Sequence, residues 1–473
     1  MSIRQKWDKM SAAKKSSLAL AFAMFFQKGI SMISTPVFTR MMNTEQYGQV
    51  TNFVSWQTII LILATLNLSQ GVFNNGMLDY ERDRDRFTLS LTFLSHISTV
   101  ICLIVYLVLR PYIYSYVDIS DLLMLLMLVY MIFTPSYTFW SCRQRYEFKY
   151  KALTLITISV SALQMVLGII SVSLVPPEEQ GTARIFSTEI VMILVGIFFY
   201  IFSLVKAKCK IKKEYVKYAF KFNIFLVPHF LAMNVLNSGD RVMINSMVGS
   251  SETAIYGVSY TAASIILIFW QAIEASWTPW LFEHLKNNII EPIKTRANQL
   301  ITMFAVVALM CMLFAPEIMA ILASGDYSSG IYIIPSVTAG VYFTAVYALY
   351  MRLEYYSKKT KATMIGTVSV AILNVFLNYI FIQWMGYIAA GYTTLVCFIL
   401  LYLFHWFYAS KIGMAKMYDN KYILFLSIAL CLISIVITFT YLVTVIRYIL
   451  ICVLLILCIV FRKKIIRLVK QIL

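Results

Sequence analysis

Long apolar stretches follow one another along almost the whole chain, separated only by short polar or charged segments. A helix that crosses the hydrocarbon core of a bilayer, about 30 Å thick, needs roughly 20 apolar residues. The sequence contains fourteen stretches of about this length, at 16–39, 45–70, 87–109, 120–141, 150–175, 186–206, 218–246, 253–281, 298–323, 331–355, 362–383, 387–409, 422–444 and 447–462. We therefore expect an all-α polytopic membrane protein with fourteen transmembrane helices.

The composition excludes an ordinary soluble domain. Of the 473 residues, 60% are hydrophobic and only 13% are charged, and the mean hydropathy is +0.77. Soluble domains carry about twice that share of charge. The apolar run that starts at residue 16 is also longer than the apolar core of a signal peptide, so we expect the first span to be retained.

The distribution of basic residues predicts the topology. Of the 40 lysine and arginine residues, 34 lie in alternate connecting segments or at the two ends of the chain. Basic residues accumulate on the cytoplasmic side of membrane proteins. This distribution predicts a cytoplasmic N-terminus at 1–15 and a basic cytoplasmic tail at 463–473. The net charge of +18 is then a topology signal and is not taken to indicate nucleic-acid binding.

The sequence lacks the motifs of the common enzyme and metal sites. It has no Walker motif, no GxSxG, no CxxC pair among its eight cysteines and only four histidines. The predicted loops are too short to form an extramembrane catalytic surface. We therefore expect a transporter rather than an enzyme, with no metal and no cofactor.

Two similar junctions suggest an internal repeat. "NTEQYGQV" and "SSETAIYGV" each place helix-capping polar residues before a Tyr-Gly pair, at Tyr47-Gly48 and Tyr256-Gly257. The copies are six predicted spans apart, so both have the same orientation in the membrane. This predicts an N-lobe at 16–206, a C-lobe at 218–409, and an additional helix pair at 422–462.

Several segments resemble the Wzx-type polysaccharide flippases of the multidrug/oligosaccharidyl-lipid/polysaccharide exporter superfamily. They are "TPVFTRMMNTEQYGQV", "CRQRYEFKYKAL", "VLNSGDRVMINSMVGSSETAIYGVSYTAA", "WTPWL" and "YYSKKTKATMIGTVSVAILNVFLNYIFIQWMGYIAAGYTT". The resemblance runs from about residue 16 to 410. It implies two lobes in the V-shaped arrangement of multidrug and toxin extrusion (MATE) transporters, in a bacterial inner membrane.

The resemblance also implies a function. Such a flippase moves undecaprenyl-diphosphate-linked oligosaccharide to the outer leaflet by alternating access, for O-antigen, capsule or exopolysaccharide synthesis. Its partners would be the lipid-linked substrate, membrane lipid, and the glycosyltransferases and polymerase of the same pathway. The alternatives are a multidrug or cation antiporter on the same fold and a flippase for lipid II.

The first predicted span contains a charge at its midpoint, Lys28, with Ser31 and Thr35 on the same helix face. A charge at that depth is costly and normally faces the protein interior. We expect Lys28 to be a cation of the substrate cavity. A structural ion pair with a carboxylate on another helix is the alternative.

A polar stripe also follows the seventh predicted span. Asn234, Ser238 and Arg241 share one face, and His229 and Asp240 lie on the adjacent face. Because Asp240 and Arg241 are consecutive, their side chains diverge and need not pair. We expect Asp240, Arg241 and His229 to stabilise the fold or to form an outer gate. Direct substrate contact is the alternative for the stripe, and Pro228 predicts a kink.

Four further residues complete the predicted site. Gln271 and Glu274 lie one turn apart on the eighth predicted span. Glu274 is a candidate to carry a proton or hold sodium for coupling to an ion gradient, or else to neutralise Lys28. Arg143 and Arg352 lie at the predicted cytoplasmic ends of two spans, where topology explains them. The alternative is that they receive the diphosphate.

Overall fold

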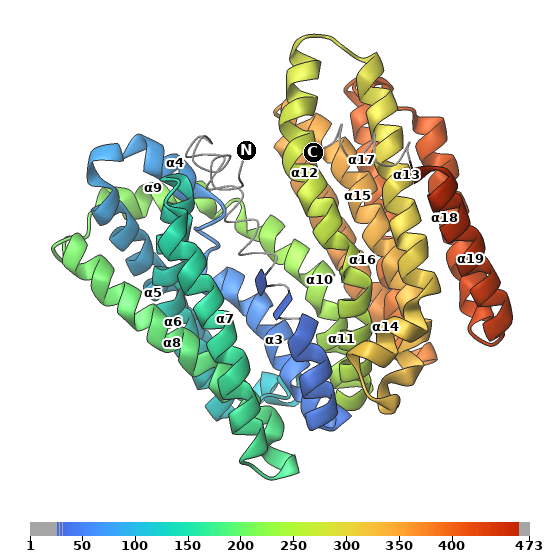
Figure 1. Cartoon of the computed structure of the whole chain (residues 1–473). Coiled ribbons are helices and arrows are strands. Elements are labelled where there is room, and N and C mark those ends of the chain that lie inside the picture. Colours follow the sequence, from blue (N-terminus) through green and yellow to red (C-terminus); the bar gives the residue numbers. More distant parts are fainter. Residues whose placement is uncertain (1–25, 28, 31, 463–473) are drawn as a thin grey trace, which may run out of the picture. The chain divides into compact units, whose positions relative to one another are not determined.

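The computed structural model describes residues 26–27, 29–30 and 32–462, and the secondary structure of these residues consists of helices joined by short turns (Figure 1). The chain divides into two compact units, Met1–Ser251 and Glu252–Leu473. An all-helical chain is what the apolar stretches predict, because hydrocarbon offers no hydrogen bonds to an exposed backbone.

The first unit is built on long helices that pack side by side (Figure 1). Residues 32–41 are helical and precede α3, whose N-cap Asn43 accepts a hydrogen bond from the Gln46 amide. The elements that follow are α3 (Thr44–Thr65), α4 (Val72–Asp79), η1 (Glu81–Asp83), α5 (Arg84–Val117), α6 (Asp121–Tyr146), α7 (Tyr150–Ser173), η2 (Pro177–Glu179), α8 (Gln180–Lys206), α9 (Lys213–Asn223) and α10 (Val227–Met247).

The interior of this unit is apolar, and much of its outer surface is apolar as well. α8 packs on α6 and α7, and α10 packs along α3. Phe53, Leu123 and Met131 are buried together in one core cluster. On α7, by contrast, Leu155 and Val166 are exposed. Exposed apolar side chains on a long apolar helix are what a lipid-facing surface requires.

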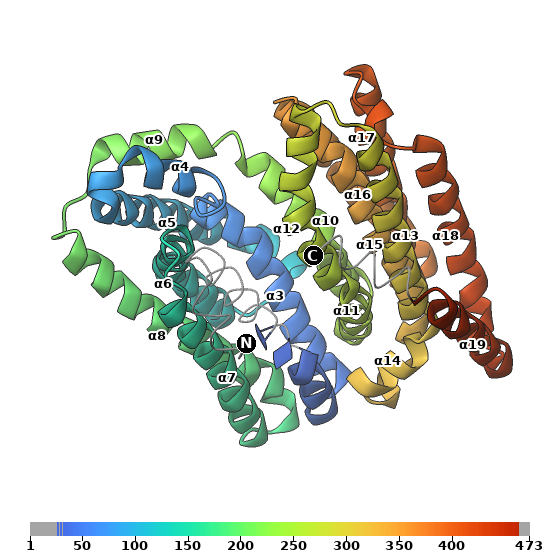
Figure 2. The same cartoon turned by 45° about the horizontal axis from the view of Figure 1, so that its top comes forward.

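The predicted span at 218–246 is broken in the structure. α9 and α10 meet at an angle of 56°, and Pro228 lies in the first turn of α10. The last residue of α9, Asn223, accepts a hydrogen bond from the Val72 amide at 3.1 Å and donates one to the carbonyl oxygen of Leu66. The bend is therefore fixed against the turn that joins α3 to α4, and α9 lies beside α4 (Figure 2).

The second unit surrounds one central helix, α15. Its elements are α11 (Ser250–Ser264, which starts at the end of the first unit), α12 (Ile266–Lys286), α13 (Glu291–Leu313), α14 (Ala315–Leu322), η3 (Gly325–Tyr332), α15 (Ile334–Tyr356), α16 (Thr360–Met385), α17 (Ile388–Lys411), η4 (Ala415–Met417), α18 (Asn420–Thr440) and α19 (Thr444–Val460). α15 packs against α17, α13, α18, α12 and α16. It is buried along almost its whole length.

Ten helices in the described part of the chain are long and apolar enough to cross a membrane, or eleven if α9 and α10 form one span. α19 is a shorter apolar helix of 17 residues. Half of the first predicted span, including its midpoint, lies outside the described residues. The chain is thus an all-helical, multi-pass membrane protein. The total of fourteen spans, the lobe boundaries and the V-shaped arrangement stay predictions.

The close approach of α3 to the chain at Ser250 depends on Gly48. A Cβ atom added to Gly48 would lie 1.8 Å from the backbone oxygen of Ser250. Next to it, the Thr44 hydroxyl donates a hydrogen bond to Ser251 Oγ at 3.0 Å. Backbone atoms cannot move aside as a flexible side chain can.

We predict that Gly48→Ala forces these segments apart and lowers the free energy of unfolding by about 1–3 kcal/mol. Thermal unfolding of the detergent-solubilised protein measures this. Gly325→Ala is the matched control, because a Cβ atom at Gly325 meets nothing within 4 Å. Equal melting temperatures for the two variants would contradict the packing described here.

Candidate functional site: charged pairs within the two helical units

The polar stripe of α10 is held by hydrogen bonds within the first unit. Asn245 donates from Nδ2 to Asp118 Oδ2 at 2.9 Å, and its Oδ1 accepts a hydrogen bond from the Ser250 hydroxyl at 3.0 Å. Asn234 donates from its side chain to the Phe230 carbonyl oxygen at 2.9 Å. These contacts fix α10 and its connection to the next helix.

Four other predicted residues of this unit are placed beside the stripe or next to it. Asp240 and Ser238 are buried, and Arg241 donates from Nη1 to the Asn237 carbonyl oxygen at 3.1 Å. His229 is partly buried, with its ring 5.7 Å from that of Phe230. This placement leaves both the gate and the ligand interpretation of Asp240, Arg241 and His229 as predictions.

The predicted central cation lies outside the described residues. Neither Lys28 nor Ser31 is part of the described structure, so their roles stay predictions. Thr35, the third member of that stripe, is buried and forms a side-chain hydrogen bond with Tyr47 of α3.

Arg143 belongs to an ion-pair network at the end of α6. Its Nη1 lies 2.5 Å from Asp85 Oδ1 on α5, and its Nε lies 2.8 Å from Glu147 Oε1. Glu147 also contacts Lys149 at 2.6 Å and Arg84 at 3.8 Å. The guanidinium of Arg143 therefore already has two carboxylate partners, which hold the ends of α5 and α6 together.

The same network lowers the pKa of the carboxyl group of Glu147, the residue that follows α6. Burial alone would raise the pKa of its carboxyl group, but hydrogen bonds from Lys149 and Arg143 outweigh burial and hold the pKa below the ordinary value.

A second pair at this end connects the segment before α9 to the start of α5. The Nζ of Lys212 lies 2.6 Å from Asp83 Oδ2, and the Tyr215 hydroxyl donates to the same oxygen at 2.8 Å. The hydrogen bonds to Asp83 and Tyr215 raise the pKa of the Lys212 ammonium above its ordinary value. Ion pairs therefore connect neighbouring segments at this end of the first unit.

The second unit brings together two predicted residues that are far apart in the sequence. Arg352 of α15 donates from Nε to Glu274 Oε1 of α12 at 3.1 Å and makes a second hydrogen bond to the same oxygen from Nη2. Their side chains remain 22% and 23% exposed. Gln271, one turn earlier on α12, is exposed. An ion pair that is partly exposed can exchange its partner for an incoming ion.

Two buried carboxylates were missed by the sequence reasoning. Glu354 of α15 is fully buried and contacts His405 of α17, Nδ1 to Oε1, at 2.7 Å. Glu189 of α8 is also buried and accepts a hydrogen bond from Gln57 Nε2 of α3 at 2.8 Å. The signal was present, because each carboxylate lies within or beside an apolar run, where an ionisable residue requires a partner.

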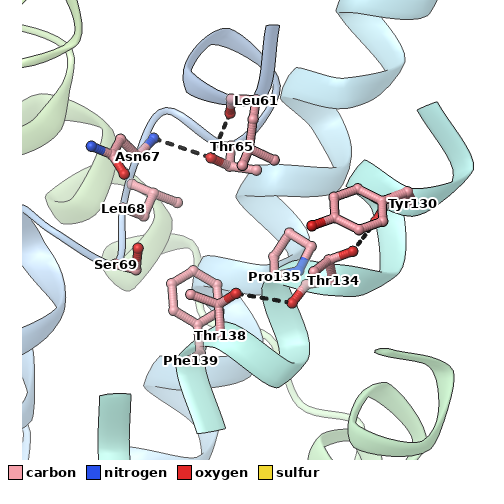
Figure 3. Close-up of a pocket in the computed structure, with 10 residues that line it drawn as sticks. All are labelled: Leu61, Thr65, Asn67, Leu68, Ser69, Tyr130, Thr134, Pro135, Thr138 and Phe139. Carbon is pink, nitrogen blue, oxygen red and sulfur yellow. Dashed lines mark hydrogen bonds between the residues drawn. The ribbon is translucent and has the colours of Figure 1, made fainter. Parts of the chain in front are cut away.

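A small pocket lies between the end of α3, the following turn and α6 (Figure 3). Its polar lining includes the hydroxyls of Thr65, Thr134 and Thr138 and the side chain of Asn67. Hydrogen bonds within single helices occupy the threonines, as in the bond from Thr65 to the Leu61 carbonyl oxygen at 2.7 Å. A volume of about 90 Å³ holds a few water molecules but not an oligosaccharide.

Glu147 supports a prediction about stability and pH. A carboxyl group whose pKa is lowered by folding contributes stability above its unfolded pKa, and that contribution is lost as the pH falls through the folded value. We predict that Glu147→Gln lowers the free energy of unfolding at neutral pH by roughly 1–3 kcal/mol, the scale of hydrogen bonds to charged groups.

The difference between Glu147→Gln and the parent should shrink as the pH falls below the ordinary glutamate pKa of about 4.3, and it should disappear below the lowered pKa of the folded state. Chemical denaturation in detergent at both pH values measures it. The exposed Glu178 on η2 supplies the control variant, Glu178→Gln. A difference that does not change with pH would show that the charge of Glu147 does not stabilise the network.

Comparison with solved structures shows the fold. The chain is similar to a lipid II flippase MurJ in an inward closed conformation, with a TM-score of 0.66, 16% identity, and coverage of 94% of this chain and 99% of that one. It is also similar to an inward-facing multidrug resistance MATE family transporter of the MOP superfamily, with a TM-score of 0.60, 14% identity, and coverage of 84% and 99%. A MATE transporter from Vibrio cholerae gives a TM-score of 0.53, 10% identity, and coverage of 87% and 98%. No curated protein matches the chain.

A family model described as polysaccharide biosynthesis protein matches residues 13–285, which is more than half of the chain. The match covers the first unit from residue 13 onward, α11 and most of α12, and the MurJ and MATE likeness extends over both units. The chain therefore belongs to the polysaccharide biosynthesis protein family.

Proposed function

We propose that this membrane flippase moves an undecaprenyl-diphosphate-linked oligosaccharide from the cytoplasmic to the outer leaflet by alternating access, for the synthesis of O-antigen, capsule or exopolysaccharide. The family and the fold support a flippase or transporter. The observation that carries the proposal is the partly exposed Arg352–Glu274 pair, because a diphosphate requires a cation that is accessible and can change partner.

The pair suggests how a diphosphate is bound and released. The planar guanidinium of Arg352 can donate to two phosphate oxygens as readily as to a carboxylate. The diphosphate and Glu274 therefore compete for the same donors. In our proposal the arriving diphosphate displaces Glu274, and the return of Glu274 to Arg352 releases the diphosphate. The displaced Glu274 carboxylate stays in the site and the diphosphate adds negative charge, so the exchange requires a further cation or a proton on Glu274.

The other predicted residues complete the proposed path. Lys28 would be a second cation for the diphosphate. Ser31, Thr35, Asn234, Ser238 and Gln271 would line the path of the glycan, and Asp240, Arg241 and His229 would form the outer gate. Arg143, which Asp85 and Glu147 hold, would stabilise the inner end of the first unit rather than bind substrate.

We also propose a location, an energy source and partners for the protein. The membrane would be the bacterial inner membrane with both termini cytoplasmic, and a proton or sodium gradient would drive transport. Glycosyltransferases and a polymerase of the pathway would be its partners. The similarity to MurJ, which is a lipid II flippase, makes lipid II the second candidate cargo. The MATE fold makes drug antiport the third.

Proteoliposomes that contain a fluorescent undecaprenyl-diphosphate oligosaccharide test the proposal. We expect the full-length protein to move this lipid between leaflets faster than empty liposomes do, and Lys28→Ala to lose the activity while it stays monodisperse. Lipid II and ethidium replace the glycolipid in parallel samples. Ion-driven ethidium export without movement of the glycolipid would contradict the proposal. A fully active Lys28→Ala would show that transport does not require a cation at this position.

Competition for Arg352 has a kinetic consequence. Glu274→Gln removes the competing carboxylate, so we expect tighter substrate binding and slower turnover. A lost ion-pair partner worth about 1 kcal/mol lowers the half-saturating substrate concentration roughly fivefold. Arg352→Gln should weaken binding. The matched control is Arg296→Gln: Arg296 lies on α13, and its guanidinium lies over the ring of Trp280. Weaker binding by Glu274→Gln would contradict the exchange mechanism.

A further inference from the structure

A buried acid–base pair lies near the end of α15, where Glu354 is two residues from the last residue of the helix, and its partner His405 is six residues from the end of α17. Glu354 and His405 are both fully buried. The Glu354 carboxylate is held on both sides, because His405 Nδ1 lies 2.7 Å from Oε1 and the Thr363 hydroxyl of α16 donates to Oε2 at 2.8 Å. None of the roles proposed above uses this pair.

The hydrogen bonds identify the atom that can gain or lose a proton. A carboxylate only accepts, so His405 Nδ1 must carry the proton that it shares with Glu354. The other ring nitrogen, Nε2, is buried and has no hydrogen-bond partner in the described part of the chain. With Nε2 unprotonated, the pair carries one net negative charge. With Nε2 protonated, the pair is an imidazolium and a carboxylate with no net charge.

The groups around the pair determine the energetic cost of a net charge on it. The ring of Tyr347 stacks on the His405 ring, with centroids 5.8 Å apart at 23°, a position in which an aromatic face attracts an imidazolium. The charged side chains around the pair are Arg352 on α15 and Glu274 on α12, which neutralise each other, and three exposed lysines between α15 and the first turn of α16, Lys358, Lys359 and Lys361. The other titratable groups close by are the tyrosines Tyr350 and Tyr355 of α15, Tyr402 of α17 and Tyr418. The three lysines are exposed whereas the pair is fully buried, and burial makes a net negative charge on the pair costly.

α15 connects this pair to the candidate substrate site. Glu354 follows Arg352 by two positions, so the two side chains leave the helix about 200° apart. Arg352 contacts α12 on one side, while Glu354 contacts α16 and α17 on the other. A change in the force between Glu354 and His405 therefore acts on the helix that holds Arg352.

We propose that Glu354 and His405 form a proton-binding site, in which His405 Nε2 takes up one proton from water, and that this proton couples to the movement of α15 during transport. The coupling rests on the proposed function, whereas proton binding does not. The site would accept a proton and no metal, because it offers a single open nitrogen.

Proton binding is tested first, on the purified full-length protein without substrate. The chain has four histidines, at 96, 229, 284 and 405, so nitrogen-labelled histidine gives a small set of NMR signals. His405→Gln assigns the signal of His405. The spectra are recorded from about pH 5 to 8, the range in which histidine switches operate, and we expect the His405 signal to change with pH. Glu354→Gln should move the titration of His405 and leave that of His284 unchanged.

Transport is tested second, in the proteoliposome assay with the undecaprenyl-diphosphate oligosaccharide. We expect the rate for the parent to change several-fold over the same pH range, and His405→Gln to remove this dependence while its melting temperature stays close to that of the parent. His284→Gln, whose native ring contacts the Trp280 carbonyl oxygen at 2.9 Å, is the matched control and should keep the dependence.

The outcomes separate the two proposals. A His405 signal that stays constant over this pH range overturns the proton site, whatever the transport assay shows. Titration of His405 with an unchanged pH profile in His405→Gln overturns the coupling. A parent protein that moves no glycolipid, although His405 titrates, contradicts the proposed function and leaves the proton site intact. If His405→Gln fails to fold, the conservative variant Glu354→Gln carries both measurements.

Discussion

Hydrocarbon cannot solvate a charge, and this constraint governs where ionisable side chains occur in this protein. The second unit satisfies it by pairing. Arg447 of α19 binds Glu317 of α14 at 2.5 Å, Arg352 binds Glu274, and Glu354 contacts His405. These pairs connect helices that are far apart in the sequence, so the partners that neutralise a charge also fix the packing. A pair that changes partner or protonation must then change the forces between helices.

The cost of an unpaired charge and the proposed function both involve α15. It is the most enclosed helix of the second unit, and it carries a charged residue on each of two opposite sides. The Arg352–Glu274 pair is partly exposed and suited to exchange with an anion, whereas the Glu354–His405 pair is enclosed and suited to a proton. Binding of an anion on one side and of a proton on the other would both act on the same rigid element. No long-range pathway is needed to connect them.

The sequence predicted the helices well because apolar length is a local property, and the family followed from motifs in the right order. It predicted less about partners. Glu274 was a candidate to neutralise Lys28, but its partner in the described structure is Arg352, 78 positions away. The break between α9 and α10 was expected only as a kink at Pro228, because the contact of Asn223 with the α3–α4 turn is set by tertiary structure. His405 and Glu354 were overlooked because they are 51 positions apart in the sequence, and only the tertiary structure brings them together.

The central claim is that a diphosphate replaces Glu274 on Arg352. Solid-state NMR of the reconstituted protein, with nitrogen-labelled arginine and bound undecaprenyl-diphosphate oligosaccharide, measures the distance from the guanidinium nitrogens to the phosphorus atoms. We expect a direct contact that disappears in Arg352→Gln and is retained in Arg296→Gln. Phosphorus close to other arginines, with the Arg352–Glu274 pair still intact, would contradict this claim.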